Sequence, residues 1–217
     1  MRINEIFLSV QGETSSIGLP TIFVRTAGCP LRCTYCDTPY ALTTENSVAM
    51  TVDEVMARVR ELRCKRVCYT GGEPLIQPKA EIQAFFDQLA AEGYELSIET
   101  SGAYPVKGFT LHERQRWIFD LKVPSSGESG RMLFDALADL RPVDEVKFVV
   151  GNRADFDWCL EQIRRYELEG RVGLLFSPVW NDVTPLELTE WVLSSGVDAR
   201  VQIQLHKIIW DPSERGV

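Results

Sequence analysis

Basic charge, histidine and long hydrophobic runs are all scarce in this 217-residue sequence. The 23 lysines and arginines against 31 acidic residues give a net charge of −8 and a pI near 4.9. Proteins that bind the phosphate backbone present basic surfaces, so we expect no direct nucleic-acid partner. No apolar run approaches the roughly 20 residues that span a bilayer, and the N-terminal residues do not resemble a signal peptide. We therefore expect a cytoplasmic protein without a membrane partner.

The sequence also lacks internal repeats and any linker rich in glycine, serine or proline. Apolar residues make up 45% and charged residues 25%, close to the averages of about 45–50% and about 25% in soluble globular proteins. At roughly 150 residues per domain, this length fits one domain better than two. We expect a single domain over residues 1–217.

Three of the six cysteines lie in one short segment, Cys29-Pro-Leu-Arg-Cys33-Thr-Tyr-Cys36. Disulfides are typical of small secreted domains, and nothing here indicates secretion. A closed zinc site needs four Cys or His ligands, and the only histidines, His112 and His206, are distant in sequence. Three thiolates on a loop instead suit a four-iron cluster with one iron open to a small molecule. A zinc site and an unligated loop remain the alternatives.

The other cysteines, Cys64, Cys68 and Cys159, have a structural explanation. Cys68 lies within an apolar run, Cys64 ends a predicted helix, and Cys159 lies in a later predicted helix. Free cysteine often packs as a small hydrophobic residue. We expect none of these three to bind a metal.

Short β-type runs alternate with helical stretches along the chain. The expected strands are Thr21–Thr26, Arg66–Tyr69, Glu95–Ile98, Trp117–Leu121, Glu145–Val150, Val172–Phe176 and Arg200–Leu205. A capping box at residues 51–54 begins one helix, and residues 184–187 begin the last one, with proline at its first helical position. Further helices are expected over 79–92, 132–140 and 154–168. This alternation predicts an α/β domain with a parallel sheet, curved or partly closed into a barrel. A doubly wound sheet is the alternative.

Polar or glycine-containing segments follow most of the expected strands. They are residues 29–36, 70–74, 99–102, 120–122, 177–178 and 206–207. The carboxyl ends of parallel strands share one face, so these segments should form one ligand-binding rim. In Gly71-Gly72-Glu73-Pro74, the glycines allow close backbone approach, and the carbonyls with Glu73 could hold an ammonium group.

The CxxxCxxC loop and the following Gly-Gly-Glu-Pro loop resemble the radical S-adenosylmethionine (SAM) superfamily. The resemblance implies a partial (β/α)6 TIM-like barrel and a [4Fe–4S] cluster on Cys29, Cys33 and Cys36. S-adenosyl-L-methionine would chelate the open iron through its amino and carboxylate groups. One-electron reduction in such enzymes gives methionine and a 5′-deoxyadenosyl radical, which abstracts a substrate hydrogen.

Further segments resemble the 7-carboxy-7-deazaguanine synthase family: Ser9-Val10-Gln11-Gly12-Glu13, Arg25, Cys36-Asp37-Thr38 and Gln204-Leu205-His206-Lys207. That family converts 6-carboxy-5,6,7,8-tetrahydropterin into 7-carboxy-7-deazaguanine with loss of ammonia, a lyase-type reaction on the route to queuosine. The resemblance implies substrate contacts from Val10, Gln11, Gly12, Glu13, Arg25, Thr70 and His206. It implies cofactor contacts from Tyr35, Cys36, Asp37, Gly72, Glu73, Ser101, Asp120, Leu121 and Lys122, and a Mg²⁺ ligand in Thr38.

The same resemblance implies N-terminal and C-terminal substrate-binding extensions around the core, a flavodoxin or ferredoxin as electron donor, and a homodimer. The residue types suit a pterin. A carboxylate and an amide, Glu13 and Gln11, read its donor–acceptor–donor edge. The planar guanidinium of Arg25 suits the substrate carboxylate.

The sequence departs from the family pattern at three places. Thr14 stands where Gly is frequent, Asp120-Leu121-Lys122 stands where many members have Ser-Pro-Lys, and residues 208–217 extend past the His-Lys pair. The alternative function is a radical SAM activase of a glycyl radical enzyme, which would keep the cluster and cofactor loops. It would leave Gln11, Glu13, Arg25 and His206 without a shared task.

Overall fold

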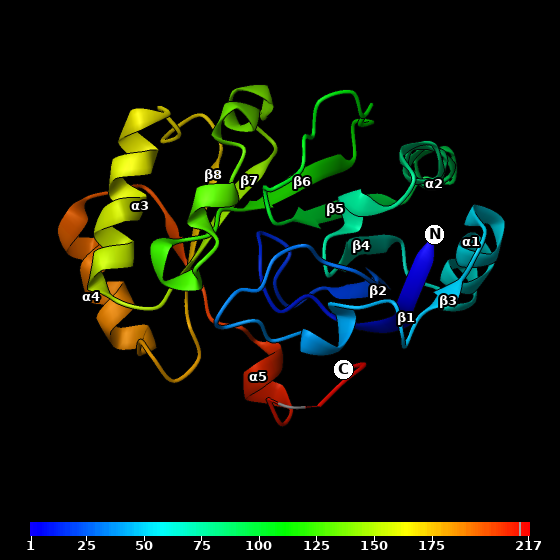
Figure 1. The fold of residues 1–217 in the computed structure, drawn as a ribbon, viewed down its shortest axis with the longest axis horizontal. Helices are drawn as coiled ribbons and strands as arrows, with labels where there is room; N and C mark the ends of the chain where they lie inside the picture. The colour runs from blue at the N-terminus through cyan, green and yellow to red at the C-terminus, as the bar shows by residue number, and fades with distance from the viewer. Residues whose placement is uncertain (213) are drawn as a thin grey trace.

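The computed structural model describes residues 1–212 and 214–217, whose strands form one nine-stranded sheet (Figure 1). The strand order is β3-β1-β2-β4-β5-β6-β7-β8-β9. The strands are β1 (Arg2–Val10), β2 (Pro20–Thr26), β3 (Val48–Ala49), β4 (Arg66–Gly71), β5 (Glu95–Thr100), β6 (Gln115–Asp120), β7 (Glu145–Val150), β8 (Gly173–Pro178) and β9 (Arg200–Val201). β1 pairs antiparallel with β2 and β3, and every other pair is parallel.

The predicted partial (β/α)6 barrel is confirmed. β2 and β4 to β8 form a run of parallel neighbours, and β3 and β9 are the outer members of the order. In Figure 1 the longer helices lie around the periphery, with the strands between them. The described residues contain no helix long and apolar enough to cross a membrane.

Four of the five α-helices in the described residues lie close to ranges that the sequence predicts. The five helices are α1 (Val52–Glu61), α2 (Lys79–Ala91), α3 (Arg153–Arg165), α4 (Pro185–Ser195) and the short α5 (His206–Ile209). Thr51 and Thr184 both form complete capping boxes, which satisfy backbone N–H groups at the first turn. Gly196 ends α4 in the left-handed conformation that favours glycine.

Three expectations about the elements were wrong. The 132–140 segment forms a 3₁₀ helix over Phe134–Asp139, a short turn before Pro142 rather than an α-helix. The strand expected over Arg200–Leu205 ends at Val201, because the following chain turns toward the N-terminal segment, where Leu205 N–H donates to the Gly12 carbonyl at 3.0 Å. The hairpin strand β1 was not expected, since its residues mix burial states without clean alternation.

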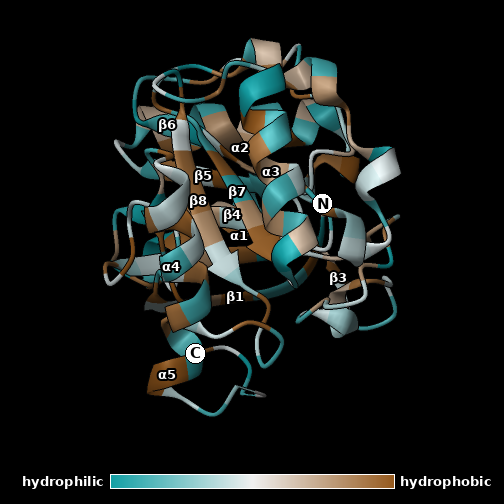
Figure 2. Ribbon diagram, turned by 90° about the vertical axis from the view of Figure 1, so that its left-hand side faces the viewer, coloured by the Kyte–Doolittle hydropathy of each residue, from teal (hydrophilic) through white to brown (hydrophobic). Residues whose placement is uncertain are grey.

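The parallel strands have one apolar face and one polar face. On β7, Phe148 is fully buried and stacks on Phe176 of β8, which in turn contacts Phe156 of α3. Its neighbour Lys147 lines a cavity instead, as expected because successive side chains of a strand point to opposite faces. Figure 2 shows hydrophobic colour gathered on strands such as β5 and β8, while the helices alternate in colour. The outward faces therefore make the core, and the inward faces are left for a site.

Candidate functional site

A cavity of about 780 Å³ lies at the carboxyl ends of the parallel strands. It is lined by loops after β2, β4 and β5 and by segments near both ends of the chain. All predicted site residues except Glu73 and Leu121 line it. Five of the six expected rim segments contribute to this one concave surface. The sixth, residues 177–178, does not, and the next residues, Val179 and Trp180, line the cavity instead.

The cysteine loop forms one wall of the cavity. Cys29, Cys33 and Cys36 are all half-buried and all line it. Cys36 N–H donates to the Cys33 carbonyl at 3.2 Å, and Thr34 binds Ser126 through its backbone N–H at 3.1 Å. The loop is thereby folded on itself and attached to the segment after β6.

Burial sets the electrostatic environment of two of the three loop thiols. Burial raises the pKa of Cys33 to about 11, an effect that the nearby Lys122 partly opposes. Burial also raises the pKa of Cys29. Among the described residues, no three Cys, His, Asp or Glu side chains are grouped closely enough to form a metal site in this conformation. The fit to a cluster therefore rests on donor type and shared position, three soft ligands facing one cavity.

The remaining cysteines and His112 lie apart from this wall. Cys68 and Cys159 are fully buried, and the Cys64 thiol donates to the Pro20 carbonyl at 3.1 Å. Cys64 follows α1 rather than ending it, since the helix stops at Glu61. His112 pairs with Asp87 at 2.8 Å on the protein surface, so it is not placed to complete a four-ligand zinc site with the loop.

The Gly-Gly-Glu-Pro loop packs directly on the base of the cysteine loop. Glu73 N–H donates to the Gly28 carbonyl at 2.8 Å. A Cβ on Gly72 would lie 2.3 Å from that carbonyl oxygen and 2.8 Å from the Ala41 oxygen, so only glycine fits. The predicted close approach of backbone is present here, although it is between two segments of the chain.

The side chains of Glu73 and Leu121 do not line the cavity, so neither side chain is placed for direct contact with a ligand there. The Glu73 carboxylate is fully buried and accepts hydrogen bonds from Thr100, Ser101 and the Leu75 backbone. These bonds join the Gly-Gly-Glu-Pro loop to the segment at the end of β5. Burial raises the pKa of Glu73, and the Ser101 hydrogen bond opposes the rise. Leu121 belongs to the hydrophobic core, because its side chain points away from the cavity that Asp120 lines.

The N-terminal segment closes another side of the cavity. Gln11 is buried and contacts Glu99 through Nε2 at 3.4 Å. Gly12 lies against His206, whose Nδ1 would be 2.2 Å from a Cβ at that position. Burial lowers the pKa of His206, although Glu13 opposes the shift. The sequence placed His206 in the same site as the N-terminal segment. It placed His206 at the end of a strand, however, whereas the residue begins the helix α5.

Thr14 shows why glycine suits the position after Gln-Gly-Glu. Its φ is 69°, in the left-handed region that β-branched residues rarely adopt. The backbone N–H donates to Gln202 Oε1 at 2.8 Å, and the hydroxyl accepts from Ser16 N–H at 3.2 Å. These contacts hold the strained turn that follows Glu13.

Arg25 projects into the cavity from β2. Its Nε donates to Glu5 Oε1 at 2.7 Å, and Tyr40 donates to the same oxygen at 3.0 Å. Burial alone would lower the pKa of Arg25, but Tyr40 and Glu5 outweigh it and the pKa is raised. The buried guanidinium of Arg25 therefore already has one carboxylate partner, Glu5, within the protein.

Thr38, Asp37 and Lys207 lie together at the mouth of the cavity. Thr38 donates to Asp37 Oδ1 at 2.9 Å, and Lys207 Nζ lies 3.5 Å from Asp37 Oδ2. Burial would raise the pKa of Asp37, yet Lys207 and the Thr38 hydrogen bond lower it to about 2. A hydroxyl and an ionised carboxylate are thus adjacent, an oxygen-rich pair of the kind that Mg²⁺ prefers.

The sequence interpretation did not identify Lys147 as a cavity residue, and it placed Glu99 in a rim segment without giving it a role. Lys147 Nζ binds Glu13 Oε2 at 2.6 Å and Asp120 Oδ2 at 3.3 Å, and Lys122 binds the same Asp120 oxygen at 3.0 Å. Glu99 accepts from Thr70 at 3.2 Å. A signal for Lys147 was present, because it lies among Val146, Phe148, Val149 and Val150, and a lysine in such a run must have a charged partner if the strand is buried.

Some buried polar atoms at the cavity have no protein partner in the part of the chain that the structure describes. They are Glu13 Oε1, Tyr35 Oη and Asp120 Oδ1. Buried polar groups are normally hydrogen-bonded. All three atoms belong to side chains that line the cavity, which makes them candidate contacts for a bound polar molecule.

The C-terminal segment after α5 also reaches the cavity. Glu214, Arg215, Gly216 and Val217 line it, and the Arg215 guanidinium lies 3.8 Å from the centre of the Tyr40 ring. The extension beyond the His-Lys pair therefore covers the mouth beside Arg25.

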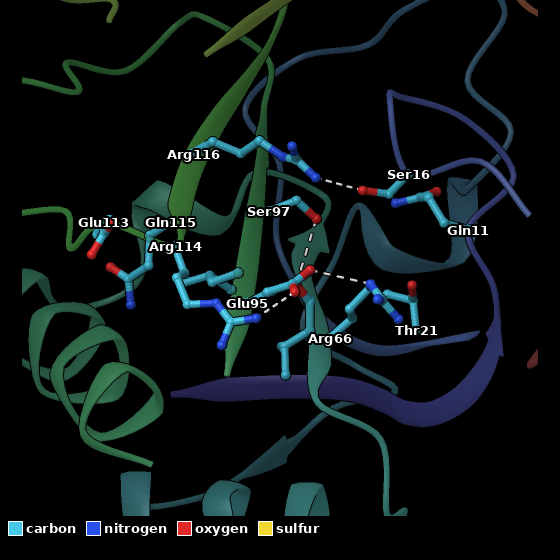
Figure 3. Close-up of a pocket in the computed structure, with 12 residues that line it drawn as sticks. Gln11, Ser16, Thr21, Arg66, Glu95, Ser97, Glu113, Arg114, Gln115 and Arg116 are labelled. Carbon is cyan, nitrogen blue, oxygen red and sulfur yellow. Dashed lines mark hydrogen bonds and ion pairs between the residues drawn. The ribbon is translucent and has the colours of Figure 1, made fainter. Parts of the chain in front are cut away.

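A smaller pocket of about 190 Å³ lies at the opposite ends of the strands (Figure 3). Figure 3 shows Glu95 between Arg66 and Arg114, with ion-pair distances of 3.1 and 2.6 Å, and Arg116 directed at Ser16. Its charges are mostly paired with one another. The pocket holds none of the cysteines, so the chemistry of the molecule is concentrated in the larger cavity.

Comparisons with known proteins agree with this geometry. The Radical SAM superfamily model matches residues 23–113, which contain the cysteine and Gly-Gly-Glu-Pro loops. A 7-carboxy-7-deazaguanine synthase from Koribacter versatilis is 39% identical over the full length of both chains, and one from Chlorobaculum tepidum is 40% identical over 100% of this chain and 97% of its own. The crystal structure of QueE from Escherichia coli matches with a TM-score of 0.77 at 24% identity, covering 94% of each chain, which supports the fold.

Proposed function

The chain belongs to the 7-carboxy-7-deazaguanine synthase family of radical SAM enzymes, and we propose that it contracts the ring of 6-carboxy-5,6,7,8-tetrahydropterin to give 7-carboxy-7-deazaguanine and ammonia. The main observation that supports this proposal is that one cavity is lined both by the three loop cysteines and by Gln11, Glu13, Arg25 and His206. An activase would need the first group without the second. The relatives support the synthase over the activase.

Substrate binding is assigned to the N-terminal segment and β2. Glu13 Oε1 is buried without a protein partner among the described residues, so it is free to accept N–H donors from the pterin edge. Gln11 beside it supplies an amide. Arg25 uses Nε for Glu5, so its terminal nitrogens are the edge that would hold the substrate carboxylate. Val10, Gly12, Thr70 and His206 complete the proposed pocket wall.

Membership of the radical SAM superfamily implies a [4Fe–4S] cluster and S-adenosylmethionine. Cys29, Cys33 and Cys36 would hold the cluster, leaving an open iron for the cofactor. When bound, the pair supplies the one-electron chemistry that removes a hydrogen atom from the substrate. The cofactor would lie along Tyr35, Asp37, Gly72, Ser101, Asp120 and Lys122, with the backbone rather than the buried side chains of Glu73 and Leu121 at its edge.

The chain's own contribution to the reaction is positioning and charge. Arg25, with Thr38 and a bound Mg²⁺, would keep the substrate carboxylate fixed while the ring rearranges. The Thr38 hydroxyl beside the ionised Asp37 supports the magnesium proposal. The C-terminal segment over the mouth would limit access of water. A reduced flavodoxin or ferredoxin would supply the electron, and the working form would be a cytoplasmic homodimer with one domain per chain.

The test is production of the deazaguanine acid by the reconstituted protein. The cluster is assembled anaerobically, and reductant, S-adenosylmethionine, Mg²⁺ and carboxytetrahydropterin are supplied, with the product identified by mass. We expect product from wild type, none from C33A, and wild-type amounts per folded protein from C159A, whose cysteine is buried in α3. Absence of product from wild type with an intact cluster would reject the proposal, as would full activity of C33A.

A further inference from the structure

One buried lysine joins the two parts of the cavity assigned to different ligands. Lys147 lies on β7 directly opposite Asp120 in the parallel register of β6 and β7. Its Nζ lies 2.6 Å from Glu13 Oε2 and 3.3 Å from Asp120 Oδ2. Lysine is rarely buried unless it is paired, and here the pairing spans the N-terminal segment and the sheet.

Both carboxylates contact Lys147 through one oxygen, and Asp120 Oδ2 is also paired with Lys122 at 3.0 Å. Each gives one oxygen to Lys147, and in each the other oxygen, Glu13 Oε1 and Asp120 Oδ1, is buried without a hydrogen-bond partner within residues 1–212 and 214–217. A carboxylate that is fixed through one oxygen has a defined rotamer, and its second oxygen is a directed acceptor. Both acceptors belong to residues that line the cavity.

The surrounding carboxylates keep Lys147 protonated despite its burial. Burial by itself would lower the pKa of Lys147, but Glu13, Asp120 and Glu99 raise it well above its ordinary value. Lys122 is the neighbouring cation, and it shares Asp120 with Lys147. Three carboxylates thus face two ammonium groups, which leaves the site able to accept hydrogen-bond donors and a cationic ligand.

Resting on the proposed function, we propose that Lys147 is a positioning residue shared by substrate and cofactor. By holding one oxygen of Glu13 and one of Asp120, it aims the other oxygen of Glu13 at the N–H donors of the pterin and that of Asp120 at the cofactor. Neither ligand needs to touch Lys147. Its removal should therefore weaken the binding of both ligands, whereas loss of either carboxylate should weaken mainly one.

The experiment measures binding without turnover, on reconstituted and unreduced holoenzyme. Fluorescence titration with 6-carboxypterin reports the substrate position, and calorimetric titration with S-adenosylmethionine reports the cofactor position. We expect K147M to weaken both about tenfold or more, the scale of a hydrogen bond to a charged group. E13Q should weaken mainly carboxypterin, D120N mainly S-adenosylmethionine, and the exposed control K65M neither.

Because K147M leaves two buried carboxylates without their shared cation, it is paired with K147R, which keeps the charge but moves the donors. K147R should have near-wild-type circular dichroism and still bind both ligands several-fold more weakly. Affinities within twofold of wild type in folded K147R, or loss of only one ligand in both Lys147 variants, would overturn the proposal. Failure of wild type to bind carboxypterin would instead reject the proposed function, and this inference with it.

Discussion

Lys147 and Phe148 are neighbours on β7, and both are almost completely buried, yet they have opposite surroundings. Phe148 lies among aromatic rings of β8 and the helix α3. Lys147 faces the barrel interior, where it contacts carboxylates from two other segments. The same alternation separates Phe119 from Asp120 on β6.

Side chains on the outward face stabilise the fold, whereas the charged side chains buried on the inward face add little or no stability. Burying apolar rings is favourable in proportion to their area. Burying ion pairs is close to neutral at best, because the lost hydration offsets the attraction. One strand therefore carries a stabilising residue and a positioning residue in adjacent positions, and substitutions on the two faces should have separable effects.

The largest effect is expected on the outward face, from F148A. Removing a fully buried phenylalanine leaves a cavity between β7 and α3, which should lower the free energy of unfolding by about 3–5 kcal/mol. Urea denaturation measures this change. L186A on the exposed side of α4 is the control and should change it by less than about 0.5 kcal/mol. A loss below about 1 kcal/mol for F148A would show that the outward face is not the stabilising one.

The inward face is tested by R25M. Loss of a charge-assisted hydrogen bond to the substrate carboxylate should lower kcat/KM by roughly 10–100-fold, corresponding to about 1.5–3 kcal/mol. R25K keeps the charge without the planar fork and should fall between R25M and wild type. The measurement is steady-state product formation, with R58M on the surface of α1 as the control. Unchanged kcat/KM in folded R25M would remove Arg25 from the substrate site.

The outward face was largely predictable from the sequence. The buried positions of α2, Ile82, Phe85, Phe86 and Leu89, follow the helical period. The capping box at 51–54 and the proline at the first position of α4 gave the starts of α1 and α4. These signals are local, since they depend on residues within one or two turns of each other. For that reason the parallel strands and helices could be placed before the tertiary structure was known.

The inward face was predictable only in part. The loops were found because carboxyl ends of parallel strands must share a face. The 3₁₀ segment before β7 and the early end of β9 accompany contacts with distant segments, from Leu133 N–H to the Gly102 carbonyl and from Leu205 N–H to the Gly12 carbonyl. The bridge from Lys147 to Glu13 joins residues 134 positions apart. The spacing of residues along one helix or strand carries no information about such a contact. The family resemblance identified site residues only within recognisable motifs, and Lys147 is in none.

A smaller effect is expected for Asp37 at the mouth of the cavity. Its pKa is lowered from 3.8 to about 2, since Lys207 and the Thr38 hydrogen bond outweigh burial. The ion pair should therefore stabilise the fold above pH 4, and this contribution should be lost as the pH falls toward 2. Because the Asp37 side chain is 48% exposed, the contribution should stay below about 1 kcal/mol.

The variant that measures this contribution is D37N, compared with wild type by urea denaturation at pH 7 and again at pH 2.5. We expect D37N to be less stable at pH 7 and the difference to shrink at the lower pH. Added salt should reduce the difference at pH 7, because a half-exposed pair is screened. A difference that grows on acidification would contradict the ion pair.

The smallest effect is expected at Thr14, where backbone conformation and a side-chain contact oppose each other. A β-branched residue at φ 69° is strained by about 1–2 kcal/mol, and glycine would relieve that strain. Glycine also adds about 0.5–1 kcal/mol of chain entropy to the unfolded state, and it removes the hydroxyl that accepts from Ser16 N–H. T14G should therefore raise the free energy of unfolding by less than about 1 kcal/mol. T14A keeps much of the strain and loses the hydroxyl, so it should fall below wild type. Equal stabilities of T14A and T14G would contradict this expectation. They would mean that the backbone bond to Gln202 holds the turn after Glu13 and that residue 14 relaxes from its positive φ. The frequent glycine of the family would then need an explanation other than φ.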